Sequence, residues 1–410
     1  MSQGKKILLL VMDGLGDRAI EALDFRTPLQ VARTPNMNWF ARRGSSGCMD
    51  VIAPGVRPGS DTSHLAILGY DPFEVYTGRG PFEAAGVGLV GKKGDVAFRC
   101  NFASVDNKLN VIDRRAGRIK EPETTELVRT LSKIRIEGVE VTVREATEHR
   151  AVLLLRGKGL SPCVSDVDPH ALARVHDCKP LVPEAKKTAK AVNDFVKWSY
   201  ELLKDHPINL KRKELGKPVA NILLPRGAGV FPDIRSFKER YGLESACVAG
   251  VSLIKGICRV CGMEVVDVPG ATGGLDTDMV GKAHAALDLL GSKDLVLVNV
   301  KAADIASHDG DFRKKIEVTE RIDRMIGVLR RKIPSDVVVA LLADHCTPVE
   351  VGDHSGDPVP LAICSESMIR DGIDAFDEVS SSKGGLGRIR GKELMPILLD
   401  VINRSEKFGA

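Results

Sequence analysis

Short apolar runs that end at polar side chains recur along the chain. The run Ile7–Met12 leads into Asp13, and the run Val337–Leu342 leads towards Asp344. Runs this short, apolar at successive positions and partly β-branched, are typical of strands buried on both faces of a sheet. Between them lie amphipathic segments such as Asp311–Lys332, which predict helices. Strands and helices in alternation predict an α/β fold with a doubly wound, mostly parallel sheet.

The middle of the chain has a different pattern. From about residue 94 to 180, shorter alternating segments such as Val96–Phe102 and Arg150–Leu155 are separated by turn-like stretches. Segments of this kind predict an antiparallel sheet. We therefore expect a smaller α+β domain inserted into the sequence of the core domain. The expected boundaries are 1–90 and 218–410 for the core, and 91–217 for the inserted domain with its connector.

Composition and charge narrow the classes of protein. The chain has 410 residues, of which 59 are basic and 55 acidic, so the formal net charge is only +4. This balance does not require a nucleic-acid partner, and 4% aromatic residues offer few platforms for stacking bases. No apolar run approaches the roughly 20 residues of a membrane helix, and the N-terminal run does not fit a signal peptide. We expect a cytoplasmic protein, and the sequence leaves its oligomeric state open.

The nine cysteines form no spacing framework for disulfides. Cys258 and Cys261 form a lone CxxC pair, which cannot supply four sulfurs to a zinc site. They fall in a segment with a helical pattern. We interpret them as buried helix residues, and a redox or metal role stays an open alternative.

Acidic and histidine side chains follow the predicted strands near both ends of the chain. Asp304 and His308 are four residues apart, so on a helix they would share one face. In a parallel α/β sheet, ligands bind beyond the carboxyl ends of the strands, which is where these side chains fall. Carboxylate oxygen and imidazole nitrogen suit Mn²⁺, Zn²⁺ and related ions. The candidate metal ligands are Asp13, Asp304, His308, Asp344, His345 and His354.

Ser60 adds a candidate nucleophile. It lies in Pro-Gly-Ser-Asp-Thr-Ser-His, ahead of a predicted helix over Thr62–Leu68. Its hydroxyl suits a helix cap, but the N–H groups at a helix N-terminus also stabilise a phosphate. Six metal ligands and a serine suffice for two metal ions and an activated nucleophile, which points to phosphoryl-group chemistry. His64 either orients the serine loop or is a core histidine, and both interpretations stay open.

These motifs resemble those of the alkaline phosphatase superfamily and, within it, of the archaeal-type cofactor-independent phosphoglycerate mutases. The serine motif Gly-Ser-Asp-Thr-Ser-His-Leu-Ala-Ile-Leu-Gly-Tyr-Asp-Pro and the later Lys-Ala-Ala-Asp-Ile-Ala-Ser-His-Asp-Gly-Asp carry the resemblance, which covers nearly the whole chain. One departure is Ala302-Ala303, where we expect a small polar residue. Further matching segments are 78–86, 113–118 and 354–360.

The resemblance implies an alkaline phosphatase-like core and conversion of 3-phosphoglycerate to 2-phosphoglycerate through a phosphoserine. It implies no bisphosphoglycerate cofactor. Two divalent metal ions are implied, with manganese expected and zinc, cobalt or magnesium as alternatives. One ion would be held by Asp304, His308 and His354. The other would be held by Asp13, Ser60, Asp344 and His345.

The inserted domain would bind the substrate as a cap. Phosphoglycerate is a compact trianion, and guanidinium groups are fitting binders for it. Arg114 and Arg115 lie at a predicted turn beside Asp113, which would hold a glycerate hydroxyl or act as a general base. Solvated charges at a turn are the alternative for these three residues. Further candidate substrate-binding residues are His149, Arg150, Arg226 and Lys255.

Two other classes of protein stay open. A metal-dependent phosphatase or phosphodiesterase, or another phosphomutase of the superfamily, would use the same core, and the fate of the phosphoserine would separate it from the mutase. A catalytically inactive metal-binding protein would carry a broken nucleophile or ligand set. All seven candidate positions are intact, which argues against that alternative.

Overall fold

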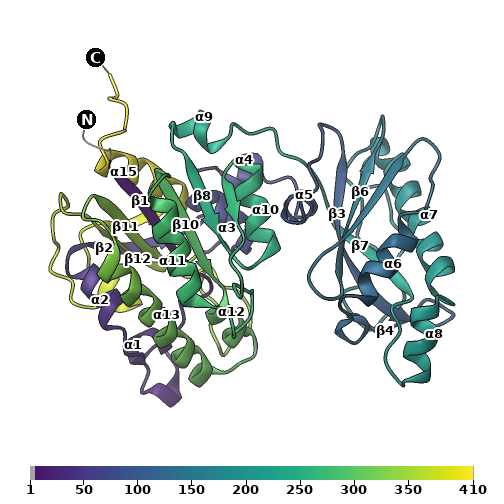
Figure 1. The fold of residues 1–410 in the computed structure, drawn as a ribbon, viewed down its shortest axis with the longest axis horizontal. Helices are drawn as coiled ribbons and strands as arrows, with labels where there is room; N and C mark the ends of the chain where they lie inside the picture. Colours follow the sequence, from purple (N-terminus) through teal and green to yellow (C-terminus); the bar gives the residue numbers. More distant parts are fainter. Residues whose placement is uncertain (1–4, 410) are drawn as a thin grey trace. The chain divides into compact units, whose positions relative to one another are not determined.

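The computed structural model describes residues 5–409, which form two compact units (Figure 1). Unit 1 contains the chain up to Val75 and from Ile234 onward, and unit 2 contains Tyr76–Asp233. Unit 1 is an α/β domain around one large sheet, and unit 2 is a smaller α+β domain with a sheet of its own. The fold class predicted from the sequence is confirmed.

The sheet of unit 1 has eight strands in the order β13-β2-β12-β11-β1-β10-β8-β9. Neighbouring strands are parallel except at β12, which runs antiparallel to both β11 and β2. The strands are β1 (Lys6–Met12), β2 (Gly44–Asp50), β8 (Ser245–Val248), β9 (Glu264–Val266), β10 (Leu295–Val300), β11 (Val337–Leu342), β12 (Val359–Cys364) and β13 (Gly387–Arg390).

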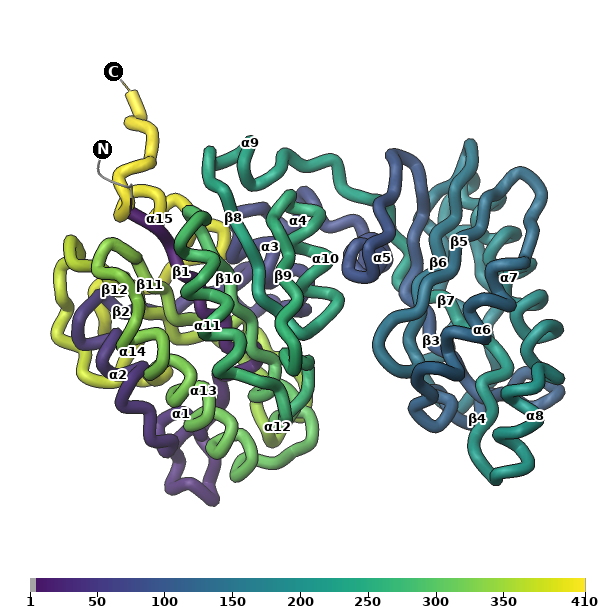
Figure 2. The backbone as a smooth tube through the Cα atoms, viewed as in Figure 1, coloured from purple at the N-terminus to yellow at the C-terminus, as the bar shows by residue number. Residues whose placement is uncertain are grey.

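The central strand β1 brings distant parts of the chain together. It pairs with β10 on one side and β11 on the other, so the start of the chain lies beside two segments from its last third (Figure 2). Residues 7–12 are buried because both faces of the sheet are covered. Since the three strands are parallel, the residues that follow them meet at one edge of the sheet.

Helices cover the sheet of unit 1. The longest, α13, packs against α1, α2, α11 and α12, and it buries Val318, Ile322, Met325 and Leu329 at helical spacing. Within residues 5–409, no helix combines the length and the apolar character needed to cross a membrane. The helices of unit 1 are α1 (Pro28–Val31), α2 (Pro35–Ala41), α3 (Ser60–Ile67), α4 (Pro72–Val75), α9 (Phe237–Tyr241), α10 (Ser252–Val260), α11 (Met279–Leu290), α12 (Ala302–His308), α13 (Phe312–Lys332), α14 (Glu378–Ser381) and α15 (Leu394–Val401).

Unit 2 is built around an antiparallel sheet in the order β4-β3-β6-β5, with β7 paired to β3 as well. Its core includes Phe102, Leu153 and Phe195, all fully buried. The strands are β3 (Val96–Val105), β4 (Val111–Asp113), β5 (Glu140–Glu145), β6 (Arg150–Arg156) and β7 (Ile222–Val230). The helices are α5 (Gly80–Gly86), α6 (Glu123–Leu131), α7 (Lys186–Leu203) and α8 (Pro207–Glu214).

Unit 2 is longer than the segment 91–217 that the sequence suggested. The strand β7 pairs with β3 from Ile222 to Val230, and α5 packs against β3, β6 and β7. Both elements therefore belong to the core of unit 2, although the sequence pattern alone assigned them to the other domain.

Candidate active site

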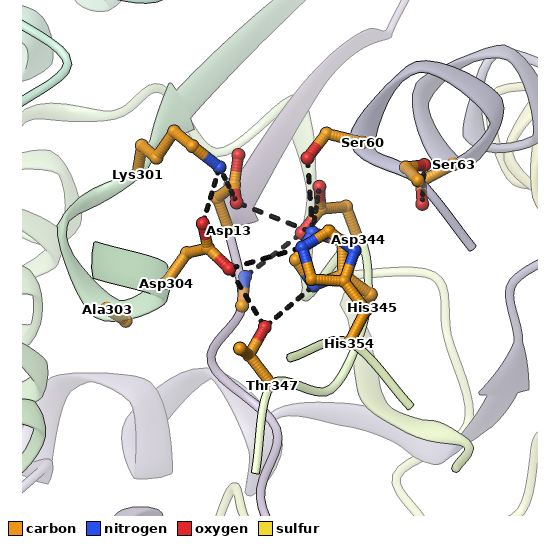
Figure 3. Close-up of polar contacts among 12 residues, drawn as sticks. Asp13, Ser60, Ser63, Lys301, Ala303, Asp304, Asp344, His345, Thr347 and His354 are labelled. Carbon is orange, nitrogen blue, oxygen red and sulfur yellow. Dashed lines mark hydrogen bonds and ion pairs between the residues drawn. The ribbon is translucent and has the colours of Figure 1, made fainter. Parts of the chain in front are cut away.

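Three carboxylates converge beyond the carboxyl ends of β1, β10 and β11 (Figure 3). Asp13 follows β1, Asp304 lies in the first turn of α12 after β10, and Asp344 follows β11; all three are buried. The convergence depends on Gly14, which has a φ of 67°. A Cβ atom there would lie 2.6 Å from the Cβ of Asp304, so only glycine permits this approach.

Two overlapping groups of side chains present ligand atoms within 4.8 Å of one another. The first is the set expected for one metal ion, and the second contains Asp304 where Asp344 was expected. The groups are Asp304, His308 and His354, and Asp13, Asp304 and His345. Asp344 lies beside the second group, with its Oδ2 atom 3.3 Å from the Nε2 atom of His345.

The cluster is short of positive charge, and its residues therefore fit divalent cations. Among the described residues, the buried Oδ2 atom of Asp344 has no hydrogen-bond partner. Burial and the neighbouring Asp13 raise the pKa of Asp344 well above its usual range. The hydrogen bond from His308 to Asp304 raises the pKa of His308 to about 9. Once deprotonated, these carboxylates and imidazoles offer the donor atoms that metal ions such as Mn²⁺ or Zn²⁺ take, and a divalent ion would supply the missing positive charge.

Lys301 is the ammonium group inside this cluster. Its Nζ atom lies 2.9 Å from Asp13 Oδ1 and 2.7 Å from Asp304 Oδ2, so it bridges the two carboxylates. Burial alone would lower the pKa of Lys301, but Asp13 and Asp304 raise it above its usual value. Lys301 was not among the site residues expected from the sequence. Its position directly after β10 and three residues before Asp304 is the signal that would have found it.

Hydrogen bonds fix the tautomer of His345. Thr347 donates its hydroxyl proton to Asp304 Oδ1 at 2.9 Å, so its oxygen accepts from His345 Nδ1, 3.0 Å away. Burial lowers the pKa of His345 far below its usual value, and the ring is neutral. The Nε2 atom therefore presents a lone pair to the cluster, as a metal ligand requires.

Ser60 lies at the start of α3 with its hydroxyl directed at the cluster. Gly59 occupies the N-cap position, so Ser60 is the first helical residue and its side chain does not serve as the cap. Its Oγ atom lies 3.2 Å from the Nε2 atom of His345. The structure thus brings Ser60 together with all six candidate metal ligands at one edge of the sheet.

A second cluster, which we name the arginine cluster, lies within unit 2. The buried Nε atoms of Arg99, Arg114, Arg150 and Arg226 have no hydrogen-bond partner in the part of the chain that the structure describes. Burial and the neighbouring Arg79 lower the pKa of Arg99 to about 9. Burial and the neighbouring Arg150 lower the pKa of His149 to about 4. Close guanidinium groups with unused donors fit a ligand with several negative charges.

Two carboxylates lie close to these arginines and partly balance their charge. Glu83 on α5 lies 3.0 Å from Arg79 Nε and 3.8 Å from Arg99 Nε. Asp168 lies 3.6 Å from Arg114 and 3.8 Å from Arg226. Arg79, Arg99 and both acids were not expected from the sequence, because an isolated charged residue in the sequence does not reveal which residues lie next to it in the fold.

Other candidates have local partners instead. The carboxylate of Asp113 accepts hydrogen bonds from the backbone N–H groups of Arg115 and Gly117 at 2.8 and 2.7 Å, and these bonds close a turn. Lys255 pairs with Asp267 at 2.5 Å on unit 1. Cys258 and Cys261 are buried in and just after α10. Asp113 and Lys255 therefore have local partners, and the two cysteines are part of the buried core.

Proteins similar to this chain in sequence or structure include phosphoglycerate mutases. The sequence profile of the family described as 2,3-bisphosphoglycerate-independent phosphoglycerate mutase matches residues 41–209. A protein of that name from Methanopyrus kandleri is 53% identical over 415 aligned residues, which cover 99% of this chain and 98% of the relative. The solved structure of a Pyrococcus horikoshii protein is 42% identical, with a TM-score of 0.88, and the match covers 99% of this chain and 100% of the other. That of the cofactor-independent phosphoglycerate mutase from Thermoplasma acidophilum is 38% identical, with a TM-score of 0.72 and coverage of 97% and 100%.

The mostly parallel sheet, with carboxylates and imidazoles gathered beyond its central strands, defines an α/β protein with a candidate metal site at the carboxyl edge of its sheet. Half of its residues are shared with full-length relatives. The chain belongs to the family of 2,3-bisphosphoglycerate-independent phosphoglycerate mutases.

A buried network supports the loops that carry the site. The ammonium of Lys315 on α13 donates to Asp17 Oδ2 at 2.8 Å and to the carbonyl oxygens of Gly16 and Thr347 at 3.1 Å. The backbone N–H of Asp17 donates in turn to Glu378 at 3.0 Å. Burial raises the pKa of Glu378 from 4.5 to about 7.

We expect the Glu378→Gln variant to gain stability over the wild type as the pH rises. Between the unfolded and folded pKa values the unfolded state ionises first, so the wild type loses up to about 3 kcal/mol of unfolding free energy on passing from pH 4.5 to above 7. Glutamine mimics the protonated carboxyl and loses nothing. Urea unfolding at about pH 5 and about pH 8 measures the difference. A difference independent of pH would contradict the assignment.

Proposed function

We propose that the protein interconverts 3-phosphoglycerate and 2-phosphoglycerate through a phosphoserine at Ser60, without a bisphosphoglycerate cofactor. The observation that carries the proposal is the position of Ser60 Oγ, 3.2 Å from His345 Nε2 and beside the carboxylate cluster. Membership of the mutase family, with relatives matched over nearly their whole length, supports the choice of substrate.

Two divalent ions would complete the site, with manganese favoured and zinc, cobalt or magnesium as alternatives. When bound, such ions supply Lewis-acid stabilisation of phosphoryl oxygens and lower the pKa of a serine hydroxyl. One ion would be held by Asp304, His308 and His354. The other would be held by Asp13, Ser60, Asp344 and His345.

The chain's own residues account for the rest of the reaction. Ser60 Oγ gives up its proton and attacks the phosphorus of 3-phosphoglycerate, the bond from phosphorus to the substrate's C3 oxygen breaks, and that oxygen takes up a proton. The 2-hydroxyl of the retained glycerate then gives up its proton and attacks phosphoserine, which forms 2-phosphoglycerate and releases Ser60 Oγ to take up a proton again. The N–H groups at the start of α3 favour negative charge on the transferred group. No water takes part, so water must be excluded while glycerate is retained.

We assign substrate binding to the arginine cluster of unit 2. The unused donors of Arg114, Arg150 and Arg226 support this assignment, and Arg99 joins them. His149 shares their surroundings. Arg115, Asp113 and Lys255 stay weaker proposals, since local contacts already account for Asp113 and Lys255.

The purified protein with 3-phosphoglycerate, Mn²⁺ and enolase tests the proposal directly. We expect phosphoenolpyruvate to form, with no stoichiometric release of inorganic phosphate. Inorganic phosphate without phosphoenolpyruvate would reject the mutase and favour a phosphatase on the same core.

Removal of metal is expected to abolish this activity reversibly. Three buried carboxylates face each other across the site, and one ammonium group cannot neutralise them. After dialysis against a chelator, activity should fall to background and the melting temperature should drop. Adding Mn²⁺ back should restore both. Full activity in a chelated sample with no metal by elemental analysis would contradict the proposed site.

A further inference from the structure

Asn299 is a polar residue inside the otherwise apolar strand β10, and its side chain is fully buried. Its amide nitrogen, Nδ2, lies 3.1 Å from Asp13 Oδ2 and 3.2 Å from His64 Nε2. One side chain therefore bridges a candidate metal ligand directly after β1 and a histidine on α3, the helix that begins with Ser60.

The direction of each hydrogen bond follows from chemistry. A carboxylate only accepts, so the amide must present its N–H groups to Asp13 rather than its carbonyl. The second N–H then donates to His64 Nε2, which leaves the ring proton on Nδ1. That Nδ1 lies 2.8 Å from the carbonyl oxygen of Ser60, to which it donates, and 3.6 Å from Asp344 Oδ2.

The amide carbonyl of Asn299 supports this reading. Within residues 5–409, its buried Oδ1 atom has no hydrogen-bond partner. A buried acceptor without a donor disfavours the folded state, so its presence needs a reason. The reason here is that both N–H groups are needed, for Asp13 and for His64. The ammonium of Lys282 anchors the same residue by donating to its main-chain oxygen at 3.0 Å.

We propose that Asn299, acting through His64, is a positioning residue that holds the first turn of α3 in register with Asp13. The inference rests on the proposed function, because the element held in place is the backbone of the proposed nucleophile. The connection runs from Asp13 through Asn299 and the ring of His64 to the main chain of Ser60. It also explains His64, which orients the serine turn and does not merely fill the core.

Replacing Asn299 is expected to lower kcat and to leave KM nearly unchanged. Asn299 belongs to unit 1 and is not one of the arginine-cluster residues to which we assign substrate binding, so the Asn299→Leu variant should keep its KM within about threefold. A nucleophile displaced by about 1 Å loses about 10²-fold in rate, and we expect kcat to fall by about that factor. Mn²⁺ affinity, measured by calorimetry, should change far less than kcat.

The control is Asn36→Leu, which removes a chemically similar bond away from the site. Asn36 Nδ2 donates to the buried carboxylate of Asp323 at 2.8 Å. That variant should keep wild-type kcat and KM. Wild-type protein that forms no phosphoenolpyruvate would reject the proposed function itself, whereas an active wild type with an unimpaired Asn299→Leu variant would overturn only the present inference.

A double-mutant cycle separates positioning from a general loss of packing. We expect His64→Gln to lower kcat to a similar degree, and the double variant to be no slower than the worse single variant within about threefold. If kcat of the double variant falls by the product of the two single losses, the two residues act independently, and the inference is overturned. A loss of Mn²⁺ affinity as large as the loss of kcat would also overturn it, because Asn299 would then act through Asp13 alone. If Asn299→Leu does not fold, His64→Gln alone still tests the connection, since normal kcat in that variant contradicts it.

Discussion

The Ser60→Ala variant is expected to lose phosphoglycerate mutase activity, with kcat lower by at least about 10⁴-fold. The proposed reaction transfers the phosphoryl group to Ser60 Oγ, whose place alanine cannot take. The neighbouring Thr347 hydroxyl is already committed to Asp304 and His345. The enolase-coupled assay measures kcat, and circular dichroism with Mn²⁺ calorimetry shows whether the fold and at least one metal site survive.

Ser63→Ala is the matched control for this variant. Ser63 lies on the same helix and is also buried, but its hydroxyl donates to the carbonyl oxygen of Gly59 at 2.8 Å, within the helix start (Figure 3). We expect it to keep kcat within about tenfold, since only a local bond is lost. A Ser60→Ala variant with more than about a tenth of wild-type kcat would refute the phosphoserine route.

The Arg150→Met variant is expected to raise KM for 3-phosphoglycerate by about 10²-fold, with a smaller effect on kcat. Arg150 is one of the four guanidinium groups with an unused buried donor, and its charge adds to that of Arg99 and Arg79 around Glu83. Losing one charge-assisted contact to a carboxylate or phosphate corresponds to about 2–3 kcal/mol of binding free energy. Steady-state kinetics separates KM from kcat.

Stability provides a second readout for the same substitution. Arg150 lies among like charges, so its removal should leave the unfolding free energy unchanged within about 1 kcal/mol. The control is Arg144→Met on the neighbouring strand β5, where the side chain is exposed. The Arg144→Met variant should keep the wild-type KM for 3-phosphoglycerate. An unchanged KM in Arg150→Met would remove Arg150 from the proposed binding site.

The sequence predicted the parts of the site that sit on regular elements. An apolar run such as Ile7–Met12 must be buried, and in a parallel sheet the residue after it must reach the ligand-binding edge. Asp13, Asp344 and the pair Asp304 and His308 were located by this argument alone. The metal sets and the substrate came from the family resemblance, which the comparisons confirm at the level of the family.

The remaining features depend on contacts between residues far apart in the chain. Lys301 and Asn299 each look like a single polar residue near the end of β10, and only pairing with β1 places them against Asp13. The extent of unit 2 was misjudged for the same reason, since the pairing of β7 with β3 joins residues 119 to 134 positions apart in the chain. Asp113 is a further example, because its position beside two arginines does not reveal that its carboxylate also closes a turn.

The most direct test of the central claim is a rapid-quench experiment with 3-phosphoglycerate carrying labelled phosphorus. During turnover, the label should appear on the peptide that contains Ser60 and pass into 2-phosphoglycerate when unlabelled substrate is added. Label on a different residue, or no protein-bound label while product is forming, would contradict transfer through this serine.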